Sequence, residues 1–236
     1  MFAGPNGSGK TTVKNSLSKP ASWFGSYINP DDLEKAVRTT GKLPIQQFGL
    51  TATTSDVRMH FASSPLFTKH FLASDVDAIL CQENVIDFHE MKFNSYSASV
   101  LSDYLRRRAM EAGKSFSFET VMSANDKVEL LREAQEKGYR TYIYFVATED
   151  PAINVQRVRH RVAEGGHDVP EEKIVARYYR SLALIKKAIR HANRAFFFDT
   201  SEEEASFFAE ITDGNSLELK SDEIPAWFQP IWDSIP

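Results

Sequence analysis

The chain reads Gly4-Pro5-Asn6-Gly7-Ser8-Gly9-Lys10-Thr11 near its beginning, and the expected fold follows from these eight residues. It follows the pattern G-x-x-x-x-G-K-[ST] in full, the pattern of a loop that binds the phosphates of a nucleotide. Glycines let successive backbone N–H groups approach a phosphate with no Cβ in the way, and a helix after the loop directs its positive end to the same anion. The stretch therefore predicts a phosphate-binding loop between a short strand, residues 1–3, and a helix over residues 9–18.

The residue types in this loop indicate how each side chain is used. We expect the Lys10 ammonium to bind the β- and γ-phosphates and the Thr11 hydroxyl to bind Mg²⁺. The remaining residues expected to contact the nucleotide are Gly4, Asn6, Gly7, Ser8, Gly9 and Thr12. The chain contains neither an LSGGQ-like stretch nor NKxD, so a transport ATPase and a guanine-specific GTPase are disfavoured. The pattern favours a small kinase that uses ATP, or GTP, together with Mg²⁺.

Segments with strand and helix character alternate after the loop. Predicted strands end at residue 28 and span residues 115–120, 139–147 and 195–198. Predicted helices begin at Asn29-Pro30, at Asp150-Pro151 and at Pro170, and span residues 100–113 and 123–138. This alternation is typical of a parallel sheet with helices on both faces. We therefore predict an α/β fold of the P-loop NTPase type, a three-layer sandwich with a mostly parallel sheet.

Length and pattern together favour one domain over residues 1–236. Residues 42–95 follow no clean period and are predicted to be a helical or mixed insertion. Residues 200–236 are predicted to form a hairpin around Asp213-Gly214-Asn215 at the sheet edge, followed by a tail. In that tail, the aromatic residues expected to dock on the core are Trp227, Phe228 and Trp232.

The composition is that of an ordinary globule, with 42% hydrophobic and 25% charged residues. The net charge of −4 argues against a protein that binds nucleic acid or an anionic membrane over its whole surface. No apolar run approaches the roughly 18–20 residues that a membrane helix needs. A single cysteine forms no internal disulfide, which fits a reducing compartment. We therefore expect a cytoplasmic protein.

Two carboxylates fall beyond the carboxyl ends of predicted strands, where a doubly wound sheet places its ligands. Asp31 follows the strand that ends at residue 28, and Glu119 lies near the end of the strand over residues 115–120. A kinase needs a carboxylate that orients the acceptor hydroxyl and takes its proton. Asp31 is the candidate, although acids in the first turn of a helix are also ordinary partners of the helix dipole.

Several stretches in order resemble the zeta toxin family of P-loop kinases: GPNGSGKTT, YINPDD, FSFET, RVRHRVAEGGHDVP with RYYRSL, and FFFD. The resemblance covers residues 1–41 and 96–200. It implies an ATP- or GTP-dependent phosphotransferase, and zeta toxins phosphorylate the 3′-hydroxyl of the sugar in UDP-N-acetylglucosamine. It also implies an antitoxin-like protein partner, because zeta toxins are held silent by a small helical antitoxin.

The resemblance assigns roles to individual residues. Asp31 resembles the base that meets the acceptor hydroxyl, while Lys10 and Thr11 resemble the groups that hold phosphates and Mg²⁺. Glu119 and Thr120 resemble the pair that binds the acceptor. Many members have an EGT-like sequence here, whereas this chain reads FET without the glycine. This difference affects where the two side chains are placed, and hence which acceptor sugar they bind.

Residues 151–194 carry ten Lys or Arg and four Asp or Glu, whereas residues 195–236 carry one and ten. The basic stretch contains arginines at positions 157, 159 and 161 and a Gly165-Gly166 hinge. We predict a lid over residues 157–180 that closes on the nucleotide and brings planar guanidinium donors to the transferring phosphoryl group. Arg161 and Arg177 are the favoured catalytic arginines, and Arg180 is assigned to substrate binding. His167, beside the hinge, is expected to cap the following helix.

Two alternatives stay open. A polynucleotide or RNA-end kinase would use the basic stretch as a phosphate track, and its binding would weaken steeply as salt rises. A nucleotide-gated interaction module would close on ATP with little turnover and present the tail or the insertion to a protein. The overall acidic charge counts against the first alternative.

Overall fold

The computed structural model describes residues 1–18, 20–166 and 168–235. The chain divides into two compact units: unit 1 consists of Met1–Ser18 and Glu119–Pro236, and unit 2 consists of Lys19–Phe118. The predicted insertion, residues 42–95, lies wholly within unit 2.

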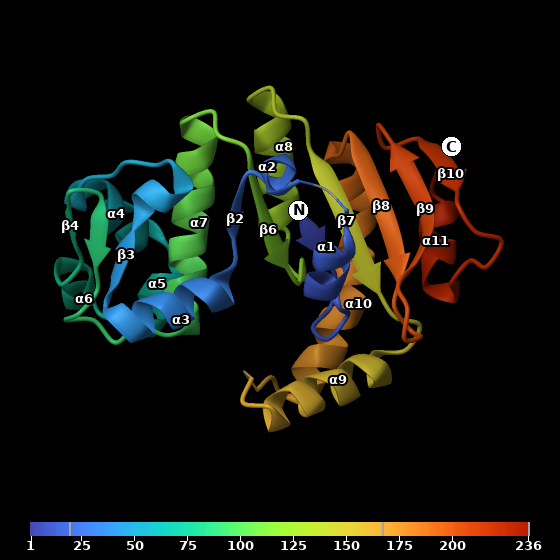
Figure 1. The fold of residues 1–236 in the computed structure, drawn as a ribbon, viewed down its shortest axis with the longest axis horizontal. Helices are drawn as coiled ribbons and strands as arrows, with labels where there is room; N and C mark the ends of the chain where they lie inside the picture. The colour runs from blue at the N-terminus through green and yellow to red at the C-terminus, as the bar shows by residue number, and fades with distance from the viewer. Residues whose placement is uncertain (19, 167, 236) are drawn as a thin grey trace. The chain divides into compact units, whose positions relative to one another are not determined.

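A mostly parallel sheet organises unit 1 (Figure 1). Its strands lie in the order β10-β9-β8-β7-β1-β6. Their bounds are β1 Phe2–Ala3, β6 Phe116–Thr120, β7 Tyr142–Ala147, β8 Arg194–Asp199, β9 Ser206–Thr212 and β10 Ser216–Leu219. Strand β1 pairs in parallel with β6 and β7, and β7 pairs in parallel with β8, whereas β9 and β10 are antiparallel to their neighbours. The predicted sheet and the hairpin at its edge are therefore confirmed.

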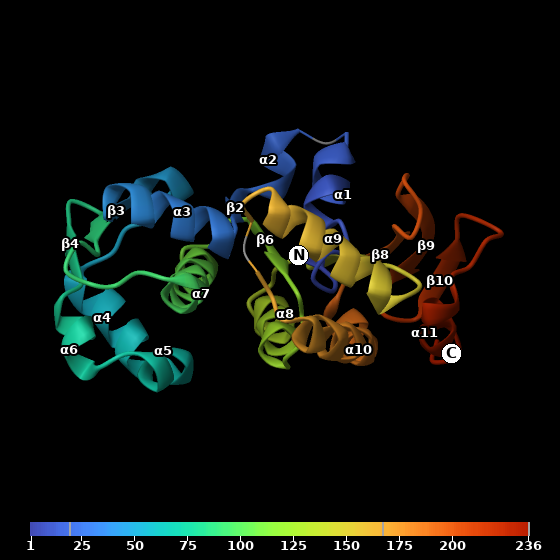
Figure 2. The same cartoon turned by 90° about the horizontal axis from the view of Figure 1, so that it is seen from below.

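Helices cover both faces of this sheet. Figures 1 and 2 show α1 on one face and α8 and α10 on the other, with α9 at the end toward which the parallel strands point. The helical bounds are α1 Lys10–Ser16, α8 Asp126–Glu136, α9 Pro151–Ala163, α10 Glu171–Ala188, η2 Ile189–His191, η3 Ala226–Phe228 and α11 Gln229–Trp232. This is the predicted three-layer α/β fold.

The helix beginnings follow from local chemistry. The Asp150 side chain accepts a hydrogen bond from the Ala152 amide, and Pro151 occupies the first turn, where its missing N–H costs nothing. Two residues after α9 ends, Gly165 has a φ of 89°, the left-handed conformation that glycine tolerates. The predicted helix pair and its glycine break are therefore present. His167 lies outside the described residues.

An aromatic cluster fills one face of the unit 1 sheet. Phe145, Phe197 and Phe208 come from adjacent strands, and the Phe197 ring centroid lies 4.9 Å from that of Phe228. The Trp227 ring packs 5.4 Å from Phe208. Edge-to-face contacts of this kind add to the energy of burial. The C-terminal aromatics Trp227 and Phe228 therefore dock on the core as predicted.

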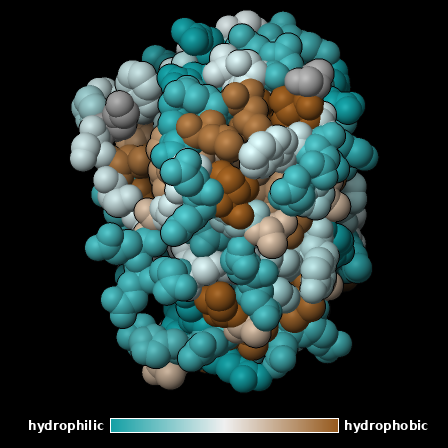
Figure 3. All heavy atoms as spheres, turned by 90° about the vertical axis from the view of Figure 1, so that its right-hand side faces the viewer, coloured by the Kyte–Doolittle hydropathy of each residue, from teal (hydrophilic) through white to brown (hydrophobic). Residues whose placement is uncertain are grey.

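The prediction that Trp232 also docks is wrong, because its side chain is 37% exposed. Helix α11 is a single short turn, in which neighbouring side chains point about 100° apart. Ile231 takes the inward position and is buried, which turns the next residue outward. Figure 3 shows the side of unit 1 that carries β10 and α11, where brown hydrophobic residues lie in the upper half among teal hydrophilic ones. Strands β9 and β10 also expose two large apolar residues, Phe207 and Leu219.

Unit 2 contains a small antiparallel sheet in the order β3-β5-β4 and a strand, β2, that pairs in parallel with residues 116–118 of β6. The bounds of its elements are α2 Ala21–Phe24, β2 Ser26–Ile28, α3 Pro30–Thr40, β3 Lys42–Pro44, η1 Ile45–Phe48, α4 Thr54–Ser63, α5 Pro65–His70, α6 Ala73–Asp77, β4 Leu80–Gln82, β5 Val85–Asp87 and α7 Ser95–Glu111. Glu83 and Asn84 join β4 to β5 with φ values of 51° and 60°. Two residues with positive φ are the signature of a tight hairpin turn.

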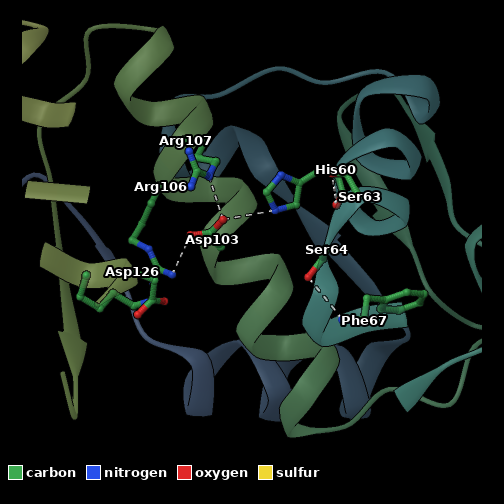
Figure 4. A network of polar contacts seen from close by, with 9 residues as sticks. His60, Ser63, Ser64, Phe67, Asp103, Arg106, Arg107 and Asp126 are labelled. Carbon is green, nitrogen blue, oxygen red and sulfur yellow. Dashed lines mark hydrogen bonds and ion pairs between the residues drawn. The ribbon is translucent and has the colours of Figure 1, made fainter. Parts of the chain in front are cut away.

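A polar cluster braces α4 against α7 in unit 2 (Figure 4). The Asp103 carboxylate accepts a hydrogen bond from Arg107 Nε at 2.9 Å and lies 3.6 Å from His60 Nε2. Burial lowers the pKa of His60, and the charge of Asp103 opposes this shift. Nearby, Phe61 packs on Phe67 with ring centroids 5.2 Å apart. Unit 2 therefore has a core of its own.

Within residues 1–18, 20–166 and 168–235, no helix combines the length and the apolar character needed to cross a membrane. The cytoplasmic location stays a prediction.

The aromatic cluster yields a prediction about stability. Phe197→Ala removes a fully buried ring and is expected to lower the free energy of unfolding by about 3–5 kcal/mol, because the cavity cannot collapse completely. Phe207→Ala is the matched control, since that residue is 36% exposed on the adjacent strand, where it stacks on Phe198, and we expect a smaller loss of about 1–2 kcal/mol. Urea titration followed by circular dichroism measures both losses. Equal losses would contradict the packing described here.

Candidate functional site

The predicted phosphate-binding loop leaves the sheet between two strands. The Gly4 amide donates to the carbonyl oxygen of Thr120 at 3.2 Å, which continues the pairing of β1 with β6. A Cβ on Gly4 would lie 2.0 Å from the carbonyl oxygen of Val146. Further along, a Cβ on Gly7, whose φ is 73°, would lie 2.5 Å from the carbonyl oxygen of Asn154. Both glycines are therefore required by close approach of the backbone.

Lys10 lies across the first half of the loop. Its ammonium group donates to the carbonyl oxygens of Gly4 at 2.9 Å and Pro5 at 2.8 Å. A phosphate oxygen is a stronger partner for an ammonium than a neutral carbonyl, because both charges contribute to the bond. The side chain is therefore placed to exchange these carbonyls for the phosphates of a nucleotide.

Thr11 and Glu119 meet at the carboxyl edge of the sheet. The Thr11 hydroxyl donates to Glu119 Oε2 at 3.0 Å. The pairing of β1 with β6 explains this contact, since Phe2 lies opposite Glu119 and Ala3 opposite Thr120. The Thr120 hydroxyl accepts a hydrogen bond from the Met122 amide at 3.0 Å, so it also supports the turn after β6. The structure therefore brings Lys10, Thr11, Glu119 and Thr120 to one end of unit 1.

Two buried polar side chains that we did not predict lie behind the loop. Asn154 Nδ2 donates to the carbonyl oxygen of Asn6 at 2.7 Å, and the Thr200 hydroxyl donates to that of Ser8 at 2.9 Å. Asn154 occupies a position on α9 next to the buried Val155 and four residues before the buried Val158. A polar residue on such an apolar face was a usable signal. Thr200 follows β8 directly, and the carboxyl-end rule that selected Glu119 also covers it.

One arginine of the predicted lid contacts the loop, and a second contacts the segment that follows β8. Arg177 of α10 lies with its Nη1 3.4 Å from Asn6 Oδ1. Arg157 of α9 lies with its Nη1 3.5 Å from the Thr200 hydroxyl and donates to the carbonyl oxygen of Glu202 at 3.4 Å. The sequence does not single out Arg157. Three arginines at alternate positions point in different directions from one helix, and which of them faces inward depends on how that helix is rotated.

The remaining lid arginines lie differently. Arg161 is exposed in the last turn of α9, and its carbonyl accepts a hydrogen bond from the Gly166 amide. Arg180 is exposed, and its Nε donates to the carbonyl of Ala176 in its own helix at 3.3 Å. Arg159 forms an ion pair with Glu171 on the other arm. Of the favoured pair Arg161 and Arg177, Arg177 contacts the loop. The roles assigned to Arg161, Arg177 and Arg180 stay predictions.

Tyr178 fixes α10 to the segment after β7. Its hydroxyl donates to the carbonyl oxygen of Thr148 at 2.6 Å and lies 3.2 Å from that of Glu149. Burial raises the pKa of Tyr178 well above its usual value. The phenol therefore stays protonated and keeps its role as a donor.

Asp31 lies in unit 2, at the second position of α3. Its amide donates to the Asn29 side chain at 3.0 Å, and Pro30 opens the helix, so the predicted helix start is confirmed. The Asp31 carboxylate is exposed. Its catalytic role stays a prediction.

The loop geometry yields a second prediction. Gly7→Ala forces either the loop or α9 to move, whereas Gly138→Ala is a matched control with a φ of 81° and no atom within 4 Å of the added Cβ. Both variants are expected to lower the free energy of unfolding by about 1–2 kcal/mol, because alanine is strained in the left-handed backbone conformation. Gly7→Ala is expected to lower it by about 1–3 kcal/mol more, because its Cβ collides with the backbone of Asn154. The difference is read from urea unfolding of the two variants. Identical losses would contradict the contact with Asn154.

Solved structures support the fold. A chain of the AvrRxo1-ORF1:AvrRxo1-ORF2 complex with sulphate ions superposes with a TM-score of 0.51 at 15% identity, covering 99% of this chain and 62% of that one. The same complex with ATP gives a TM-score of 0.51 at 14% identity, with the same coverage. Such identities show a shared α/β fold, and this chain spans less than two thirds of that protein.

Sequence comparisons identify the family. An uncharacterised protein of Haemophilus influenzae (strain Rd) is 29% identical over 63 residues, which are 27% of this chain and 45% of that protein. This chain thus matches less than half of that curated relative. The family model for the zeta toxin matches residues 87–210, just over half of the chain. The matched region includes Glu119, Thr120 and both lid helices, while the phosphate-binding loop and Asp31 precede it. The chain belongs to the zeta toxin family.

Proposed function

We propose that this protein is an ATP-dependent kinase that transfers the γ-phosphoryl group to a hydroxyl of a small molecule. One observation carries the proposal: the Thr11 hydroxyl lies 3.0 Å from the Glu119 carboxylate, beside a loop whose lysine already binds backbone oxygens. A hydroxyl, a carboxylate and an ammonium at the end of a phosphate-binding loop are the groups that a phosphoryl transfer requires. Membership of the zeta toxin family supports the same reaction.

We take ATP as the nucleotide, because the AvrRxo1-ORF1:AvrRxo1-ORF2 complex, whose fold this chain shares, was crystallised with ATP. GTP remains the alternative. For the acceptor we take the 3′-hydroxyl of the sugar in UDP-N-acetylglucosamine, which the family resemblance implies.

The residues at the loop fit Mg²⁺. Thr11 Oγ1 and Glu119 Oε2 are hard oxygen donors separated by 3.0 Å. Mg²⁺ prefers oxygen ligands of this kind, so Thr11 and Glu119 would hold the ion beside the phosphates. When bound, Mg²⁺ would neutralise charge on the β- and γ-phosphates.

The chain's own groups have distinct tasks in this mechanism. Lys10 holds the terminal phosphates, and Arg177 supplies planar donors that stabilise negative charge on the transferring group. Arg161 and Arg180, exposed on the lid, would join only if the lid closes. Asp31 orients the acceptor hydroxyl and takes its proton late, as expected for a loose transition state. Glu119 has two assignments, a metal ligand from its contact with Thr11 and, with Thr120, an acceptor contact from the resemblance.

A protein partner is part of the proposal. The AvrRxo1-ORF1 structures contain AvrRxo1-ORF2, and zeta toxins are restrained by an antitoxin. We propose that a comparable protein binds this chain and holds it inactive.

The kinase proposal predicts the behaviour of two pairs of variants. Purified protein with ATP, Mg²⁺ and UDP-N-acetylglucosamine is expected to yield a phosphosugar, detected by mass spectrometry. Lys10→Ala is expected to lower kcat/KM about 10²–10³-fold, as loss of a charge-stabilising donor does, and Asp31→Asn about 10²–10⁴-fold. The matched controls Lys14→Ala, on the same helix, and Asp32→Asn, the adjacent acid, are expected to stay within about twofold.

If the wild-type protein binds ATP tightly but phosphorylates nothing in a broad pool of metabolites, the kinase proposal fails and the interaction module is favoured. Transfer to RNA ends with steep salt dependence would favour the polynucleotide kinase instead.

A further prediction separates the two assignments of Glu119. If Glu119 binds the metal, Glu119→Gln is expected to raise the Mg²⁺ concentration for half-maximal rate about tenfold, because the variant loses a charged oxygen ligand, while the acceptor KM stays unchanged. If Glu119 binds the acceptor, the acceptor KM rises and the Mg²⁺ dependence does not change. Titrations of Mg²⁺ and of acceptor measure the two effects, with Glu129→Gln on α8, whose side chain is 46% exposed, as the control.

A further inference from the structure

The back of the phosphate-binding loop is held by two side chains that the loop pattern does not include. Asn154 is fully buried, and its Nδ2 donates to the carbonyl oxygen of Asn6 at 2.7 Å. Thr200 is 7% exposed, and its hydroxyl donates to the carbonyl oxygen of Ser8 at 2.9 Å. The two carbonyls belong to alternate residues of the loop. One support comes from α9 and the other from the end of β8.

These contacts set the direction of two amides. In a trans peptide unit the C=O and the following N–H point in opposite directions, and every peptide bond in the described part of the chain is trans. Because the Asn6 carbonyl points at Asn154, the Gly7 N–H points away from α9. Because the Ser8 carbonyl points at Thr200, the Gly9 N–H points away from the end of β8. Both amides are therefore directed to the side of the loop that these elements leave open.

The polar character of both side chains is explained by these bonds. A buried amide or hydroxyl costs free energy unless it is hydrogen-bonded, and a leucine or valine of similar size would fill the same space without that cost. Asn154 Oδ1 accepts a hydrogen bond from the buried Thr148 hydroxyl, so the amide is paired at both ends. The Thr200 hydroxyl also lies 3.2 Å from the Ala147 carbonyl oxygen.

The fold has other supports at the same places. Helix α9 begins with the Asp150 cap and packs through Val155 and Val158 against Ile174 of α10. Strand β8 is paired along its whole length with β7 and β9. Removal of either polar contact therefore leaves the elements themselves supported.

We propose that Asn154 and Thr200 are positioning residues for nucleotide binding: they pin the Asn6 and Ser8 carbonyls behind the loop, so that the Gly7 and Gly9 amides face the phosphate chain. The proposal rests on the proposed function only in requiring that the loop binds the phosphates of ATP. It does not depend on the acceptor or on transfer.

The test compares variants of matched shape. Thr200→Val removes the hydroxyl and keeps the volume, Thr200→Ser keeps the hydroxyl, and Asn154→Leu replaces the amide. Thr141→Val is the control, because Thr141 is a buried threonine whose hydroxyl donates to the His191 carbonyl at 2.8 Å. Thr141 precedes β7, at the opposite end of the parallel strands from Thr200.

Binding of ATP and of inorganic tripolyphosphate, each with Mg²⁺, is measured by isothermal titration calorimetry on the full chain. Thr200→Val and Asn154→Leu are each expected to weaken both ligands about tenfold, the effect of about one hydrogen bond. Thr200→Ser is expected to bind within about twofold of wild type. Thr141→Val is expected to lose similar stability in urea with unchanged affinity for both ligands.

Wild-type affinity for both ligands in Thr200→Val and Asn154→Leu overturns the proposal and leaves the kinase intact. A loss for ATP without a loss for tripolyphosphate also overturns it, because the defect would then lie at the base or sugar. If the wild type binds ATP but transfers nothing, the proposed function fails, while a shared loss for both ligands still supports the positioning role. Asn154→Leu tests the proposal independently if Thr200→Val is too unstable to assay.

Discussion

The arrangement of unit 1 depends on a glycine at position 4, where the chain continues from β1 between strands β6 and β7. Phe2 and Ala3 are fully buried and pair in parallel on both sides, with β6 and with β7. At the next residue the amide still pairs with the Thr120 carbonyl, while the Val146 carbonyl oxygen occupies the place where a side chain would stand. Only glycine fits at this position, because any Cβ would collide with that carbonyl oxygen. The chain therefore turns at the carboxyl edge of the sheet and places the loop beside Glu119.

Features with a local cause could be predicted from the sequence. The alternation of strands and helices, the capped helix starts and the Asp213-Gly214-Asn215 hairpin follow from periodicity and turn chemistry. The contact between Thr11 and Glu119 agrees with the rule that ligands gather at the carboxyl ends of parallel strands. The roles of Asp31 and of the lid arginines still rest on the resemblance.

Features with a long-range cause could not be predicted. Asn154 and Thr200 meet the loop across 148 and 192 residues of chain; their positions mark them as candidates, but the sequence does not show that they contact the loop. The choice of Arg157 over its neighbours depends on how α9 is rotated, which one helix alone does not decide. The hairpin at Glu83 and Asn84 contains no glycine, so its sequence gives little sign of a tight turn.

The tryptophans of this chain divide into two kinds. Trp23 and Trp232 are 56% and 37% exposed, whereas Trp227 is buried, and its indole N–H donates to Asp199 at 2.7 Å. Asp199 directly precedes Thr200, whose hydroxyl reaches the loop. One buried indole is thus hydrogen-bonded to the residue that precedes Thr200, one of the two side chains behind the loop. Quenchers dissolved in water are therefore expected to reduce the fluorescence of Trp23 and Trp232 before that of Trp227.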